Sequence, residues 1–174
     1  TGSVQHVLWH VSDNSLTNLT TCSSGAKTTS DRLIGVHSSL LGTGYPSSVV
    51  VFNADTKATT VTLGIYDALT ATRLGGFTTD IVPANGERIY TVASIEQTAG
   101  ITPGATMYHY VVKTESALTG HIAHLMTNVQ AGVVTDMSAV CPLGSAASVA
   151  ATSIVRQGSI FSSAQAGSQS FLRF

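Results

Sequence analysis

The alternation of hydrophobic and polar residues predicts a chain of short β-strands joined by turns. The clearest case is residues 59–67, where Val61, Leu63 and Ile65 fall on one face and threonines on the other. A period of two residues is that of a half-buried strand. Similar runs recur between Gly, Pro, Asn and Asp residues. The other expected strands are residues 4–11, 16–20, 32–36, 48–53, 73–82, 87–92, 107–113, 118–128 and 133–139.

A single short helix is expected, at residues 94–98, ending at Gly100. Many short strands with almost no helix favour an all-β fold, an antiparallel β-sandwich of the Ig-like or Greek-key type with extra terminal strands. A closed barrel is the alternative. The alternating phase of the strands predicts a buried core that contains Val61, Leu63, Ile65, Ile81, Ile89, Val111 and Ile122.

Two segments far apart in the chain resemble each other. Residues 1–22 read TGSVQHVLWHVSDNSLTNLTTC and residues 119–141 read TGHIAHLMTNVQAGVVTDMSAVC, with Thr-Gly, a His and a final Cys in matching places. Such internal repetition is typical of arrays and assemblies. We therefore expect residues 1–22 to be the end of one module, 23–141 a complete module, and 142–174 a linker and the first strand of a further copy.

Composition and charge exclude several classes of protein. Charged residues make up 10% of the 174 residues and the net charge is −1, so the chain offers no basic footprint for nucleic acid and no polybasic patch for anionic lipid. No uninterrupted apolar run approaches the ~18 residues that a transmembrane helix needs. The low charge also means that Thr, Ser, Asn and Gln must cover much of the surface.

Motifs for catalysis, cofactors and metals do not stand out. The sequence has no P-loop, nucleophile elbow or paired Cys-x-x-Cys motif. His121 and His124 are three positions apart in an expected strand, so their side chains should point to opposite faces. His6 and His124 lie between apolar neighbours and should be hydrogen-bonded, partly buried imidazoles. We expect no enzyme activity, no cofactor and no metal site.

Aromatic residues offer one candidate binding surface. Tyr108 and Tyr110 share a strand face, and we expect Trp9 and Tyr45 to lie near the surface. Flat rings stack on sugars, so a glycan-binding platform is an open alternative.

Cys22 and Cys141 occupy matching places in the two repeats. A disulfide between them is our prediction, which an oxidising compartment would permit. Two buried thiols are the alternative.

One long run resembles a known class of module. VVVFNADTKATTVTLGIYDALTATRLGGFTTDIVPANGERIYTVASIEQTAGI is similar to the tandem β-sandwich (Ig-like) modules of bacterial secreted and cell-surface proteins. The resemblance covers roughly residues 48–141. It implies a secreted or surface location and a non-catalytic role as a spacer, an adhesive domain or a fibre building block.

The two ends of the chain carry the strongest hint of function. Residues 4–11 and 169–174 read as apolar strands whose own module is incomplete, and an unpaired apolar strand must find a partner. The residues expected to pair between subunits are Val4, Val7, Leu8, Trp9, Val11, Phe171, Leu172 and Phe174. We therefore expect copies of this chain to be its partners in an extracellular fibre or surface assembly. An adhesive or carbohydrate-binding module, with a glycan or host-surface ligand, is the alternative.

Overall fold

The computed structural model describes residues 7–10, 15–18, 27–28, 32–104 and 109–138. The chain divides into Thr1–Pro142 and Leu143–Phe174, and all of the described residues belong to the first part. The predicted strand at residues 169–174 and the division of the chain into modules therefore lie outside what the structure describes. For the first three of these ranges we describe the backbone only.

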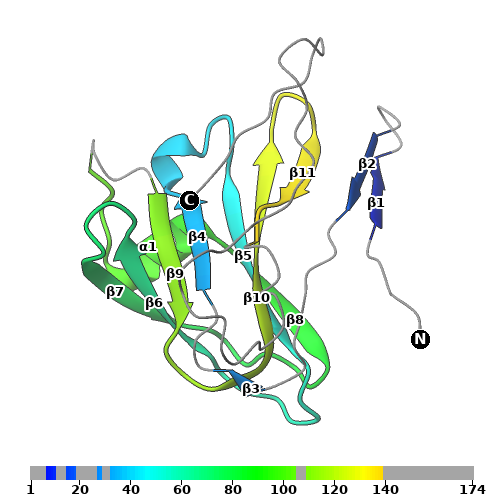
Figure 1. Ribbon diagram of the computed structural model, residues 1–174, viewed down its shortest axis with the longest axis vertical. Helices are drawn as coiled ribbons and strands as arrows, with labels where there is room; N and C mark the ends of the chain where they lie inside the picture. The colour runs from blue at the N-terminus through cyan, green and yellow to red at the C-terminus, as the bar shows by residue number, and fades with distance from the viewer. Residues whose placement is uncertain (1–6, 11–14, 19–26, 29–31, 105–108, 139–174) are drawn as a thin grey trace, which may run out of the picture. The chain divides into compact units, whose positions relative to one another are not determined.

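Two antiparallel sheets form a β-sandwich, which confirms the predicted all-β fold (Figure 1). The sheet that we call the β5 sheet has the order β11 (Val133–Asp136), β10 (Leu118–Asn128), β5 (Ser47–Asn53) and β8 (Gly86–Thr91), and the short β3 (Lys27–Thr28) also pairs with β10. The β6 sheet has the order β4 (Arg32–His37), β9 (His109–Thr114), β6 (Thr62–Asp67) and β7 (Arg73–Thr78).

A separate two-stranded hairpin joins β1 (Val7–His10) to β2 (Ser15–Asn18). Both strands were expected from the sequence, in slightly longer forms. In the ranges that the structure describes, β1 pairs with β2, its neighbour in sequence. Any partner of β1 in a second subunit stays a prediction.

The core lies between the inner faces of the two sheets. Four of the predicted core residues, Val61, Leu63, Ile65 and Ile122, are buried there. Further large members of the core come from both sheets and from the segment before β8, and they include Leu33, Val36, Val49, Val51, Phe77, Val82, Tyr110, Val112 and Leu118. Burial of alternate residues along each strand supplies the hydrophobic stabilisation of the sandwich.

Three of the predicted core residues do not belong to the core. Ile89 in β8 and Ile81 just before it are 57% and 63% exposed, and Val111 in β9 is half-buried on the outer side. Each has an apolar or aromatic neighbour that takes the inward position instead. Beside Ile89 that neighbour is Tyr90, whose ring packs edge-on against Phe77 at 4.9 Å between centroids.

The outward positions of Ile81 and Val111 have the same cause, because in each case the adjacent residue points inward. Val82 is fully buried and forms an isolated bridge with Thr59, which turns the preceding Ile81 outward. In β9, Tyr110 and Val112 point inward, so Val111 between them points away from the core.

One α-helix, α1 (Val92–Ala99), follows β8 and confirms the single helix expected from the sequence. The Thr91 side chain accepts a hydrogen bond from the Ser94 backbone N–H, which is an N-cap. Gly100 ends the helix at φ 66°, the left-handed conformation that favours glycine. A short 3-10 helix, η1 (Ser39–Leu41), follows β4 and was not expected.

Candidate functional site

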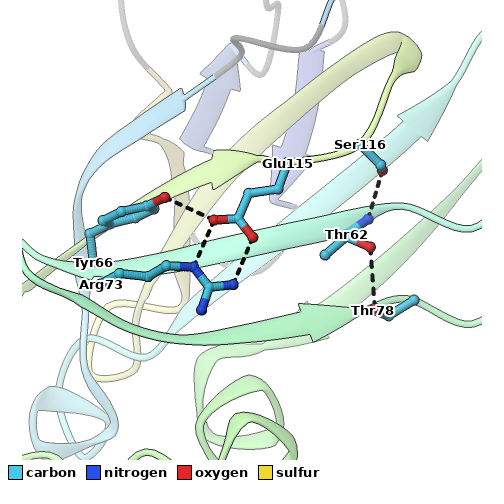
Figure 2. A network of polar contacts seen from close by, with 6 residues as sticks. All are labelled: Thr62, Tyr66, Arg73, Thr78, Glu115 and Ser116. Atoms are coloured by element: carbon cyan, nitrogen blue, oxygen red, sulfur yellow. Dashed lines mark hydrogen bonds and ion pairs between the residues drawn. The ribbon is translucent and has the colours of Figure 1, made fainter.

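A polar network lies on the outer face of the β6 sheet (Figure 2). The Glu115 carboxylate lies between the Tyr66 hydroxyl and the Arg73 guanidinium. Arg73 donates from Nε to Oε1 at 2.9 Å and from Nη2 to Oε2 at 2.7 Å, while Tyr66 donates to Oε1 at 2.8 Å. This is a two-point Arg–carboxylate pair, the geometry that fixes both side chains most firmly.

Two facing glycines make room for this network. Gly64 in β6 is paired with Gly76 in β7. A Cβ atom at Gly64 would clash with the carboxylate of Glu115 and the ring of Tyr66, and one at Gly76 would lie 2.9 Å from Nη2 of Arg73. The absence of side chains at these two positions therefore lets the ion pair lie flat on the sheet.

The electrostatics of the network keep Glu115 ionised. Hydrogen bonds from Arg73 and then from Tyr66 lower the pKa of Glu115 from 4.5 to about 2. The same contact with Glu115 raises the pKa of Arg73. A carboxylate with such a low pKa holds no proton to donate near neutral pH. The arrangement can therefore present a fixed, polar surface, and it is unsuited to general acid catalysis.

Further along the same face, hydroxyl groups continue the polar surface. Ser116 accepts a hydrogen bond from the Thr62 backbone N–H at 2.8 Å, and the hydroxyls of Thr62 and Thr78 lie 3.3 Å apart (Figure 2). Thr62 and Thr78 are direct cross-strand partners. Around β6 and β7 the outer face of the β6 sheet thus carries hydroxyls and one ion pair, whereas Ile34 and Val111 form an apolar pair on the same face between β4 and β9.

A cluster of histidines lies where the two sheets meet. The His37 ring lies 5.1 Å from the His109 ring and 6.3 Å from the His124 ring. His124 is fully buried, and its Nε2 atom is hydrogen-bonded to the Ser47 hydroxyl at 2.7 Å. His37 reaches the Tyr45 carbonyl from Nδ1 at 3.1 Å. The expectation of a buried, hydrogen-bonded imidazole is confirmed for His124, and His6 lies outside the described residues.

The Ser47–His124 pair resembles a nucleophile beside a base, but its burial argues against that chemistry. Ser47 is 4% exposed, so a substrate has no access to its hydroxyl. No group of three or more His, Cys, Asp or Glu residues in the described ranges is arranged to hold a metal ion. The pair is therefore best explained as a hydrogen bond that satisfies two polar side chains inside the sandwich.

Tyr110 cannot belong to the aromatic platform that the sequence left open as an alternative. Tyr110 is 1% exposed and its hydroxyl donates to Glu96 Oε1 at 2.7 Å. Burial, together with that contact to Glu96, raises the pKa of Tyr110. Tyr45 is 48% exposed, whereas Tyr108 and the ring of Trp9 lie outside what is described. Tyr110 is thus part of the core.

The middle of the outer face of the β5 sheet is apolar, whereas Glu87 and Thr91 of β8 lie on the same side of the sheet. Val50 in β5 faces Ile89 of β8 on one side and Ala123 of β10 on the other. In the next outward row, the Phe52 ring lies 5.3 Å from that of His121, so His121 and His124 do point to opposite faces, as expected. Val50 and Ala123 are buried even though they point away from the core. The middle of this face therefore differs from the hydroxyl-lined surface around Thr62 and Thr78 on the other sheet.

Most of the predicted assembly residues lie outside the described residues. Of the eight, Val7, Leu8 and Trp9 fall in β1, where only the backbone is described. Val4, Val11, Phe171, Leu172 and Phe174 are outside the described ranges, as are Cys22 and Cys141. Their pairing stays a prediction.

Comparisons of the chain with protein-family models, with curated proteins and with solved structures find no match. Among the described residues, no helix has the length and apolar character needed to cross a membrane.

Sequence reasoning missed the network around Glu115 and the contacts of Ser47 and Glu96. The signal that could have found the first is the pair of glycines at positions 64 and 76, which interrupt two otherwise regular strands. Glycine inside a strand often marks a close approach of other atoms, and here those atoms belong to Arg73 and Glu115.

Proposed function

We propose that this protein is a non-enzymatic building block of an extracellular bacterial fibre or surface assembly, held together by strand addition between subunits. The observation that supports the proposal is the apolar row of Ala123, Val50 and Ile89 on the outer side of the β5 sheet, which ends at the exposed Ile89. A sheet that packs a core on one side and stands alone in water usually has a polar outer side. Apolar residues on both sides are typical of a sheet that is covered on both faces.

The chemistry of the polar clusters also supports a structural role. Glu115 is fixed in an ion pair, and the Ser47–His124 pair is buried. Neither cluster combines an accessible nucleophile with a base that is free to act. Both clusters instead join strands that are distant in sequence, which suits a rigid building block.

In this proposal the terminal segments supply the added strands. Residues 4–11 and 169–174 are the donor strands. A secreted or cell-surface location is consistent with this role. The resemblance to tandem β-sandwich modules suggests that the protein is of the same type. Leaving a side chain such as Phe171, Leu172 or Phe174 in water would forgo about 1.5–3 kcal/mol of hydrophobic free energy for each residue. Main-chain hydrogen bonds to a neighbouring subunit would add to that gain.

Deletion of residues 169–174 tests the proposal. The shortened chain should keep the β-rich circular dichroism spectrum and cooperative unfolding of the full chain, but it should no longer form polymers in negative-stain electron microscopy. The matched control replaces the same six residues by a Gly/Ser segment of equal length. Normal polymers from either variant would contradict the donor role of this segment.

An adhesive or carbohydrate-binding module is the second candidate, and the outer face of the β6 sheet favours it. The ion pair of Arg73 and Glu115 is a fixed polar surface, and the aromatic ring of Tyr66 lies beside it. Arg73 also has N–H donors beyond the two that bind Glu115. A glycan array with the full chain would test it. Binding that is lost in Tyr66→Ala and kept in Tyr45→Ala would support this candidate.

A further inference from the structure

The edge of the β5 sheet at β8 has the features of a self-pairing surface. On one side β8 pairs with β5 along its whole length. On the other side, residues 87–90 make no backbone hydrogen bond to any other element in the described part of the chain. Glu87, Arg88 and Ile89 are all exposed. Free N–H and C=O groups in a row along an exposed strand are a template for a further strand.

We propose that β8 pairs antiparallel with β8 of a second copy of this chain, about a twofold axis normal to the sheet, with Ile89 opposite Ile89. This interface goes beyond the proposed function, because it uses neither of the terminal segments. It is an isologous contact, which closes on itself and gives a dimer.

The charges and the apolar residues of β8 together favour this register. With Ile89 opposite Ile89, Glu87 lies opposite Thr91 and Arg88 lies opposite Tyr90, so no two like charges face each other. A shift by two residues in one direction would place Arg88 against Arg88, and directly opposed like charges are destabilising. A shift by two residues in the other direction would place Ile89 opposite Thr91 and would break the apolar row across the outer face. A twofold axis normal to the sheet keeps inner and outer faces aligned, which excludes registers that are shifted by one residue.

The apolar residues of the outer face favour the same arrangement. Ala123, Val50 and Ile89 form a row across three strands of the β5 sheet, and the row ends at Ile89, which is 57% exposed. In the proposed pair the row continues through Ile89, Val50 and Ala123 of the second copy. Ile81, whose carbonyl accepts from Arg88 Nε, adds an exposed apolar side chain beside the same edge. The pairing would therefore remove apolar surface at its centre and leave charged groups at its rim.

Cysteine cross-linking in the full chain tests the register directly. Residues directly opposite each other in an antiparallel pair have Cβ atoms about 4.5–5.5 Å apart, close to the separation that a disulfide requires. Ile89→Cys should therefore form a disulfide-linked dimer under mild oxidation, which peptide mass spectrometry distinguishes from any bond of Cys22 or Cys141. Glu87→Cys is the matched control, because the two introduced thiols would be four residues out of register and should remain unlinked.

A second pair of variants tests the energetics. Ile89→Lys should raise the dissociation constant of the dimer at least tenfold in analytical ultracentrifugation, because it places two positive charges opposite each other. Leu69→Lys is the control, because Leu69 is equally apolar and 85% exposed but lies in the turn between β6 and β7. Equal dissociation constants for the two variants, or cross-linking of Glu87→Cys as readily as Ile89→Cys, would overturn the inference.

The outcomes separate this inference from the proposed function. Polymers that form without the Ile89→Cys cross-link would contradict the β8 pairing and leave the role of residues 169–174 intact. A cross-linked dimer from a chain that never polymerises would support the β8 pairing and contradict the proposed function.

Discussion

The two outer faces of the sandwich differ in chemistry although both belong to antiparallel sheets of similar size. The β6 sheet presents hydroxyls and the Arg73–Glu115 ion pair. The β5 sheet presents Val50, Phe52 and Ala123 in the middle of its outer face and Glu87 and Thr91 on its edge strand β8. The two faces therefore offer different chemical surfaces.

The largest expected loss of stability comes from a substitution on the inner side of the β6 sheet, and it is the reference for the substitutions on the two outer faces. Leu63 is fully buried in the core between the sheets. Leu63→Ala should lower the free energy of unfolding by about 2–5 kcal/mol, because it removes buried methyl groups and leaves a cavity. Urea denaturation would measure it. Leu69→Ala, at an exposed turn, is the control and should change the stability by less than about 0.5 kcal/mol.

A hydroxyl placed on each outer face would sharpen the comparison itself. Val50→Thr should lower the free energy of unfolding by about 1–3 kcal/mol, because Val50 is buried and the new hydroxyl would replace a methyl group in an apolar site. Val111→Thr, on the half-buried outer side of β9, should cost less than about 0.5 kcal/mol. Both values come from chemical denaturation. Equal costs at the two sites would mean that the faces do not differ as described.

A methyl group on the polar face should disrupt the ion pair. Gly64→Ala would place its Cβ against the Glu115 carboxylate and the Tyr66 ring, so we expect a loss of about 1–3 kcal/mol, the usual range for overpacking. Gly44→Ala is the matched control, because no atom lies within 4 Å of its added Cβ. A change of less than about 0.5 kcal/mol in Gly64→Ala would show that the network moves aside without cost.

The smallest expected change in stability is the one that the Arg73–Glu115 ion pair contributes, and it depends on pH. The folded-state pKa of Glu115 is lowered from 4.5 to about 2. Its contribution to stability is therefore present above pH 4.5 and is lost as the pH falls from 4.5 towards 2. Glu115→Gln should lower the free energy of unfolding by about 0.2–1 kcal/mol at pH 7, the usual range for an exposed ion pair.

The difference between the wild-type protein and Glu115→Gln should shrink as the pH approaches 2. Denaturation of both proteins at pH 7 and near pH 2 would measure this, and the subtraction cancels the other carboxyl groups. A difference that stayed constant across this range would contradict the role of the ion pair.

The sequence predicted the elements well where pattern and turn chemistry agreed. β10 begins and ends at the predicted residues 118 and 128, and α1 ends at Gly100, as its left-handed conformation requires. Strand faces were less certain where two apolar residues stood side by side. In Ile89-Tyr90 and Ile81-Val82 either residue could point inward. The choice was made by partners in the other sheet or in a distant segment, such as Phe77 for Tyr90.

The polar clusters could not be predicted for a related reason. Glu115 follows β9, whereas Arg73 and Tyr66 belong to β7 and β6, and the three meet only because β6 pairs with both of its neighbours. Ser47 and His124 are separated by 77 positions in the chain. A strand pattern gives the face on which a residue lies, but it does not give the register between strands.

The buried Glu96 of α1 has a consequence for how the chain folds. Its Oε1 accepts the Tyr110 hydroxyl and also the Ser39 backbone N–H, which is 57 positions away in the chain. The helix therefore reaches its final position only after segments from both halves of the chain have come together. Because ordering such distant segments is entropically costly, proteins rich in non-local contacts refold in about milliseconds to seconds. In pulse-labelling hydrogen exchange, the amides of α1 should be protected no earlier than those of β5 and β10.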